Sequence, residues 1–99
     1  MESVKKVELI EKVLFTLNKN KTRATYESVA RLLGLAPYGV SKYLGHKRPH
    51  ASWVVSKSNK LPTGYVQSQY HPDLFLNDTV IGSVDELNKL LEKDQRDLT

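Results

Sequence analysis

The chain has 99 residues, no cysteine and a formal net charge of +4. This length suits one hydrophobic core, so we expect a single domain over residues 1–99. The lack of cysteine excludes disulfides, thiolate zinc sites and thiol nucleophiles. No apolar run reaches the roughly 20 residues that span a bilayer, and the N-terminus lacks a signal-peptide pattern. We therefore expect no membrane contact and a cytoplasmic location.

Three helices are predicted before residue 46. The first is indicated by apolar residues that recur every three or four positions, namely Val4, Val7, Ile10, Val13, Leu14 and Leu17. Thr25 suits the N-cap of the second helix, which Gly34 ends as a residue of left-handed conformation. Pro37 suits the first turn of the third helix, and Gly45 ends it. A helix-turn-helix core is thus predicted.

Beyond Pro49 the pattern changes to short extended runs. Residues 53–55 and 64–66 flank a polar turn at 58–60, which predicts an antiparallel β-hairpin. Residues 74–76 and 79–81 form either a second hairpin or a packed loop. Ser83 and Glu86 form a capping box that begins a final helix. The predicted fold is α+β and winged-helix-like, with a three-helix helix-turn-helix core, a β-hairpin wing and a C-terminal helix.

Charge is divided unevenly along the chain. Residues 1–70 carry twelve lysines and arginines against four glutamates, a balance of +8, whereas residues 71–99 carry three against seven, a balance of −4. Basic side chains release counterions from phosphates, so we expect double-stranded DNA as a partner. The acidic C-terminal helix is a candidate contact for a protein partner. The candidate DNA-binding residues are Arg23, Thr25, Tyr26, Tyr38, Ser41, Lys42, Lys47, Arg48, Lys57 and Lys60.

Several segments resemble the DNA-binding domain of the alkylguanine-DNA alkyltransferases. They are Thr-Tyr-Glu-Ser-Val-Ala-Arg-Leu-Leu-Gly at 25–34, Val-Ser-Lys-Tyr-Leu-Gly at 40–45, Trp-Val-Val-Ser at 53–56 and Lys-Leu-Pro-Thr-Gly-Tyr at 60–65. The resemblance covers roughly Val4 to Tyr65. The alkyltransferase-like proteins share this domain and recognise alkylated bases without repairing them, so the resemblance implies a DNA-repair role.

The resemblance implies roles for individual residues. The family's tyrosine at the start of the second helix pushes on a phosphate to rotate a damaged nucleotide outward, and Tyr26 occupies that position. The family's arginine on the third helix fills the gap in the base stack. Lys42 is its nearest match, without the planar guanidinium. The family's Gly-Tyr element walls the base pocket, and Gly64-Tyr65 resembles it.

The chain departs from the family at the acceptor motif. Where the family has Pro-Cys-His-Arg, this sequence has His50-Ala51-Ser52-Trp53, and without a thiolate no alkyl group is accepted. We therefore predict a DNA-binding protein that is not an enzyme. Ala51, Trp53 and Tyr65 are the candidate residues of a base pocket, and Trp53 either packs in the core or stacks on a base.

Other chemistry is not indicated by the sequence. His46, His50 and His71 lack the spacing of metal ligands, so no metal or cofactor is predicted. Ser52 and Ser56 lie near His50 without an acidic residue to orient it, so no catalytic residue is predicted. Two alternative functions remain. One is a sequence-specific winged-helix transcriptional regulator that acts as a dimer, and the other is a protein-interaction adaptor that uses the wing and the acidic C-terminal helix.

Overall fold

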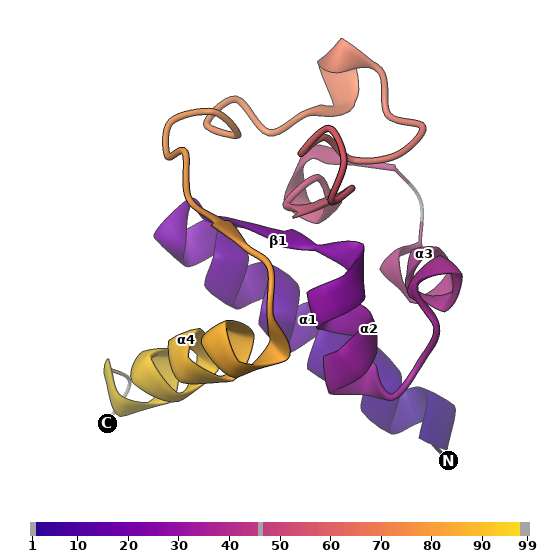
Figure 1. Ribbon diagram of the computed structural model, residues 1–99, viewed down its shortest axis with the longest axis vertical. Helices are drawn as coiled ribbons and strands as arrows, with labels where there is room; N and C mark the ends of the chain where they lie inside the picture. Colours follow the sequence, from indigo (N-terminus) through magenta and orange to yellow (C-terminus); the bar gives the residue numbers. More distant parts are fainter. Residues whose placement is uncertain (1, 46, 98–99) are drawn as a thin grey trace.

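The computed structural model describes the backbone of residues 2–45 and 47–97 and the side chains of residues 5–45 and 47–94. Within these ranges the chain is an α+β domain. Its elements are α1 (Glu2–Asn20), β1 (Arg23–Thr25), α2 (Tyr26–Leu33), α3 (Pro37–Leu44), η1 (Pro49–Ala51), β2 (Val54–Val55), η2 (Gln67–Gln69), β3 (Val80–Ile81) and α4 (Val84–Asp97). In Figure 1, β1 lies at the centre, α1, α2 and α4 lie below it, and the long segment of residues 60–80 arches above.

The apolar stripe of α1 forms one side of the core. Ile10, Val13, Leu14 and Leu17 are fully buried, as the three-and-four spacing predicts. Val7, predicted on the same stripe, is 45% exposed. The side chain of Val4 lies outside the described residues. The helix is therefore amphipathic over its second half.

The ends of α2 and α3 are fixed by local chemistry. The Thr25 hydroxyl accepts the backbone N–H of Ser28 at 3.2 Å, which caps the first turn of α2. Gly34 ends α2 with φ of 72°, and Gly45 follows α3 with φ of 76°. Pro37 begins α3, where its missing N–H has no helical partner. The predicted boundaries of both helices are confirmed.

The sheet differs from the prediction. Its strand order is β2-β1-β3, and both pairings are parallel. The predicted antiparallel hairpin is wrong, because β2 pairs with β1 and residues 64–66 form no strand. Residues 74–76 form turns beside the sheet, and β3 pairs with β1, so the packed-loop alternative holds there.

Trp53 and Arg23 tie the sheet to its surroundings. Trp53 is fully buried, and its indole N–H donates to the side-chain oxygen of Asn18 at 3.1 Å. The core-packing alternative for Trp53 is therefore confirmed. The buried Arg23 guanidinium donates to the carbonyls of Lys60 at 3.1 Å and Asn77 at 3.3 Å. These bonds hold both ends of the 60–80 segment against β1.

The C-terminal helix closes the domain. The Ser83 hydroxyl accepts the Glu86 N–H at 3.2 Å, so Ser83 caps the helix as predicted. The Glu86 carboxylate accepts the Ser83 hydroxyl at 3.1 Å, whereas in a full capping box it accepts the backbone N–H of the cap residue. Leu87 and Leu91 are buried in the core. Of the helices in the described part of the chain, none is long and apolar enough to cross a membrane.

Candidate nucleic-acid interface

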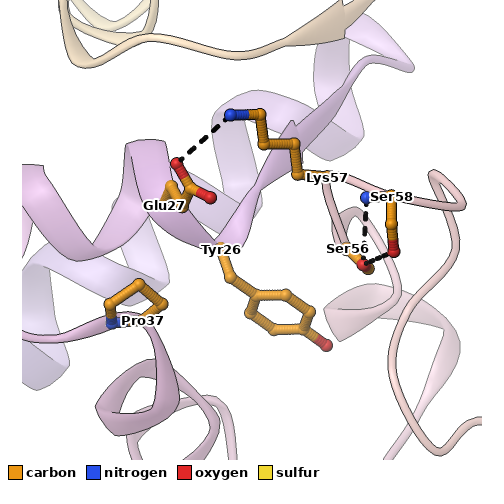
Figure 2. A pocket seen from close by; sticks show the side chains of 6 residues that line it. All are labelled: Tyr26, Glu27, Pro37, Ser56, Lys57 and Ser58. Carbon is orange, nitrogen blue, oxygen red and sulfur yellow. Dashed lines mark hydrogen bonds and ion pairs between the residues drawn. The ribbon is translucent and has the colours of Figure 1, made fainter.

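Parallel pairing of β1 with β2 brings two distant segments together. The register Thr25↔Val55 places the ends of both strands at the same edge of the sheet. Because α2 starts immediately after β1, Tyr26 emerges beside Ser56, the residue that follows β2. Figure 2 shows the Tyr26 ring lying between Pro37 of α3 and the serines that follow β2.

Two hollows flank the Tyr26 ring. The larger has a volume of about 580 Å³ and is lined by Tyr26, Glu27, Pro37, Ser56, Lys57 and Ser58. Its size falls within the roughly 300–1,000 Å³ of ligand sites. The smaller measures about 100 Å³ and is lined by Tyr26, Ser41, Leu44, Gly45, Lys47, Thr63 and Tyr65. We call the two hollows together the Tyr26 groove, which runs between α3 and residues 56–65.

Side chains that line the groove form hydrogen bonds with one another and with nearby backbone N–H groups. The Tyr26 hydroxyl accepts the N–H of Thr63 at 3.0 Å, which ties α2 to the loop after β2. The Ser56 and Ser58 hydroxyls lie 2.9 Å apart, and the Ser58 N–H donates to the Ser56 hydroxyl at 3.2 Å. Tyr26 is half-buried, so one side of its ring packs on the core while the other lines the groove.

Basic side chains predominate in and around the groove. Residues 28–72 contain six lysines and arginines and no aspartate or glutamate. Lys42, Lys47, Lys57 and Lys60 are all exposed. Among the side chains that line the groove, Glu27 alone carries a carboxylate. It faces Lys57 at 4.0 Å, and both side chains are too exposed for this ion pair to add much stability.

Several predicted DNA contacts lie on or beside this groove. Tyr26, Ser41, Lys47 and Lys57 line it. On α3, Lys42 is exposed, and Tyr38 has 88% of its surface open to solvent.

Lys60 and Arg48 lie at the margins of this surface. Lys60 is exposed, and its ammonium donates to the carbonyl of Lys57. Arg48 is half-buried: its guanidinium donates to the Leu44 carbonyl at 2.8 Å and lies 3.7 Å from the Glu11 carboxylate. At least one N–H group of the Arg48 guanidinium is therefore used to hold the C-terminal end of α3.

Two of the predicted DNA contacts serve the fold instead. Arg23 is 6% exposed and Thr25 is 4% exposed. The Arg23 guanidinium bonds two carbonyls and lies 5.3 Å from the centre of the Phe75 ring, so it does not reach the surface. The Thr25 hydroxyl is used as the cap of α2. This corrects their assignment as phosphate contacts.

The predicted base pocket is not assembled. Ala51 and Trp53 belong to the hydrophobic core, whereas Tyr65 lines the smaller hollow of the groove. Burial raises the pKa of Tyr65, and a hydrogen bond with the Arg48 backbone partly opposes this shift. Tyr65 therefore keeps its proton and presents a neutral hydroxyl. At about 100 Å³ the smaller hollow is well below the usual size of a ligand site.

Sequence reasoning missed Glu27, Pro37 and Ser58 as residues of the larger hollow, and Leu44, Gly45 and Thr63 as residues of the smaller one. Pro37 was read only as a helix start and Ser58 only as a turn, because the predicted hairpin placed residues 56–58 away from α2. The signal available was the adjacency of Glu27 to Tyr26. Within the described side chains, no three histidine, cysteine, aspartate or glutamate residues gather closely enough to hold a metal ion.

Comparison of the chain with protein-family models, with curated proteins and with solved structures found no match. The groove, its charge and its location at the ends of β1 and β2 are therefore the basis for any functional assignment.

Proposed function

We propose that the chain is a non-catalytic domain that binds duplex DNA through the Tyr26 groove and the exposed side of α3. The observation that carries this proposal is that the exposed Lys47 and Lys57 line the groove around the half-buried Tyr26, within a stretch, residues 28–72, that contains no aspartate or glutamate. Exposed lysines of this surface neutralise phosphates and release counterions. The acidic residues of α4 lie on a separate element.

The resemblance to alkyltransferase-like proteins supports the manner of binding. In this proposal α2 and α3 act as a helix-turn-helix and α3 lies against the DNA, as in winged-helix-like proteins. Tyr26, at the first position of α2, then meets the phosphate of a distorted nucleotide, and Lys42 lies near the centre of the contact. Such an arrangement favours damaged or distorted duplexes over regular ones.

The proposal includes no covalent step. Ala51 stands where the resemblance implies the acceptor thiol, and its methyl group is 1% exposed within the core. Side chains of the groove supply hydroxyls and ammonium groups, which suit phosphate and sugar contacts. The role that we assign is recognition within DNA repair.

Titration of a fluorescent duplex with the protein tests the proposal. Affinity should fall at least tenfold as salt rises from about 50 to 200 mM, because several phosphates are neutralised. The Lys47→Gln/Lys57→Gln double variant should bind more weakly and show a shallower salt dependence.

A control double variant removes the same charge from another surface. Lys89 and Lys93 lie on the exposed part of α4. The Lys89→Gln/Lys93→Gln variant should therefore retain nearly full affinity. Equal losses in the two double variants, or no duplex binding at low salt, contradict the proposal.

A further inference from the structure

A separate hollow lies between the sheet and α4, and none of its residues lines the Tyr26 groove. It measures about 350 Å³, within the roughly 300–1,000 Å³ of ligand sites. From the sheet it is lined by Thr22, Thr79 and Ile81. Thr79 and Ile81 lie two residues apart, as do Thr22 and Ala24, the partner of Ile81. Because side chains alternate between the faces of a strand, these residues share the face that α4 covers.

The helix side of this hollow carries two lysines without an ion pair. It is lined by Glu86, Lys89, Leu90 and Lys93. Lys89 and Lys93 are exposed, and neither ammonium lies within 4.0 Å of a carboxylate among the side chains that the structure describes. The Glu86 carboxylate accepts the Ser83 hydroxyl at 3.1 Å. The hollow therefore combines apolar surface from Ile81 and Leu90 with two cations that are open to a ligand.

The hollow also includes part of an edge strand. The order β2-β1-β3 pairs β3 with β1 on one side, and within residues 2–45 and 47–97 no other strand pairs with it. Thr79 and Gly82, on either side of β3, are exposed. In Figure 1, β3 continues through a short turn into α4. An unpaired strand edge presents N–H and C=O groups with which an extended peptide can pair.

An extended acidic peptide fits these features. A main chain that pairs with β3 places every second side chain over the hollow. Residues two apart on a strand and four apart on a helix have a similar spacing, roughly 6–7 Å, so successive side chains on this face can match Lys89 and Lys93. An apolar side chain next to them can cover Ile81 and Leu90. The irregular stretch of a second copy does not fit, because residues 60–72 contain no aspartate or glutamate.

We propose that the hollow between β3 and α4 binds an extended acidic peptide of a partner protein, which adds a strand to β3 and pairs its carboxylates with Lys89 and Lys93. This inference does not depend on the proposed DNA binding, because the two surfaces share no residue. Although the net charge of α4 is negative, the lysines of this hollow select an acidic partner. The domain thus has one surface for DNA and another for protein.

Fluorescence titration with the labelled peptide Ser-Thr-Val-Thr-Glu-Thr-Glu-Ser tests the site. In a strand, its valine and both glutamates lie on one face. The wild-type protein should bind this peptide, and the same peptide with glutamine for both glutamates should bind roughly 3- to 10-fold more weakly, as expected for two exposed charge pairs. Methylation of the backbone nitrogens of its threonines should abolish binding, because strand pairing needs these N–H groups.

The two double variants of the DNA test separate the two surfaces. Lys89→Gln/Lys93→Gln should lower peptide affinity roughly 3- to 10-fold and retain duplex affinity, whereas Lys47→Gln/Lys57→Gln should do the reverse. Melting curves check that both variants are folded. No peptide binding, equal binding of the glutamine peptide or equal peptide affinity of the two variants overturns this site, whatever the duplex titrations show. Self-association of the protein that Lys89→Gln/Lys93→Gln abolishes assigns the edge to a second copy and also overturns it.

Discussion

Tyr26 serves the fold and the proposed interface through different parts of its side chain. Its ring packs on the core and lines both hollows, whereas its hydroxyl holds the Thr63 N–H at 3.0 Å. Removal of the hydroxyl and removal of the ring therefore have separable consequences.

Tyr26→Phe should keep DNA binding near the wild-type level and lower stability by about 1 kcal/mol, the usual value of one hydrogen bond. Tyr26→Ala should lower Tm by roughly 5–15 °C through lost packing. It should also weaken binding to alkylated or distorted duplexes more than to regular duplexes, because the ring stabilises a rotated nucleotide. Titrations at low temperature with melting curves separate the two effects. Undiminished binding of every duplex by folded Tyr26→Ala would falsify the docking arrangement.

Lys42 is exposed on α3 and makes no ion pair with a described side chain within 4.0 Å. Lys42→Ala should weaken binding to regular and distorted duplexes equally, by roughly 1–2 kcal/mol for one central charged contact. Its Tm should match that of the wild type. Lys89→Ala on α4 is the matched control and should leave affinity unchanged. Similar affinities for the two variants would place the interface elsewhere.

At the scale of elements, the segment of residues 60–80 is held by polar contacts rather than by strands. The backbone N–H of His71 donates to the Ser52 hydroxyl at 2.9 Å, and the His71 ring nitrogen Nδ1 accepts the Asp73 N–H at 3.0 Å. The ring centroids of His71 and Trp53 lie 4.8 Å apart. A neutral histidine is required here, because a protonated Nδ1 accepts no hydrogen bond.

The state of His71 predicts a pH-dependent stability. Desolvation lowers the pKa of His71 below its ordinary value of 6.5, and the charges of Lys21 and His50 act in the same direction against that of Asp73. The folded state thus binds the proton less tightly than the unfolded state. Stability should be full above about pH 6.5 and fall as the pH drops below it. Urea unfolding between about pH 5 and 7 measures this. His71→Gln should flatten the dependence, and an unchanged slope in that variant would assign it to another group.

At the scale of the whole molecule, α4 packs on the core through Leu87 and Leu91 and contacts α1 through one buried acidic side chain. Asp94 lies 3.1 Å from the Lys19 ammonium and accepts the Thr16 hydroxyl at 3.2 Å. The radius of gyration of 12.5 Å is close to the roughly 13 Å expected for a compact domain of 100 residues.

Asp94 should stabilise the protein except in acid. Burial acts to raise the pKa of Asp94, but hydrogen bonds and charge from Lys19, with the hydroxyl of Thr16, more than offset it, so its pKa lies below the ordinary 3.8. The contribution is present above about pH 4 and is lost as the pH falls. Asp94→Asn should cost about 1 kcal/mol at pH 7. The difference from wild type should shrink progressively as the pH falls below about 4, as urea titrations will show. Glu92→Gln, exposed on the same helix, should be neutral throughout.

The sequence predicted the helices because their signals are local. The cap at Thr25, the left-handed Gly34 and the proline at the start of α3 all lie within a few residues of the boundary that they set. The same holds for the Ser83 cap of α4. Each of these features depends on residues close together in the sequence, so it can be predicted without knowledge of the tertiary structure.

The sheet and the groove could not be predicted in this way. An apolar run such as Trp53-Val54-Val55 is compatible with parallel and antiparallel partners. β1 was missed because two of its three residues, Arg23 and Thr25, are polar, although both are buried. Since the groove depends on β1 pairing with β2, the position of Ser56 beside Tyr26 followed only from the structure. The sequence identifies the individual basic residues, but it does not show that Lys47 and Lys57 line the same groove.

The central position of β1 has a consequence for how the chain folds. β1 is formed by residues 23–25, yet its partners are residues 54–55 on one side and 80–81 on the other. Each pairing closes a long loop, and the entropy of closure is lost before the contacts form. The local helices can therefore form early, whereas the sheet waits for both distant segments. During synthesis, the groove beside Tyr26 takes shape only after β2 has left the ribosome, and β1 keeps one unpaired edge until β3 arrives.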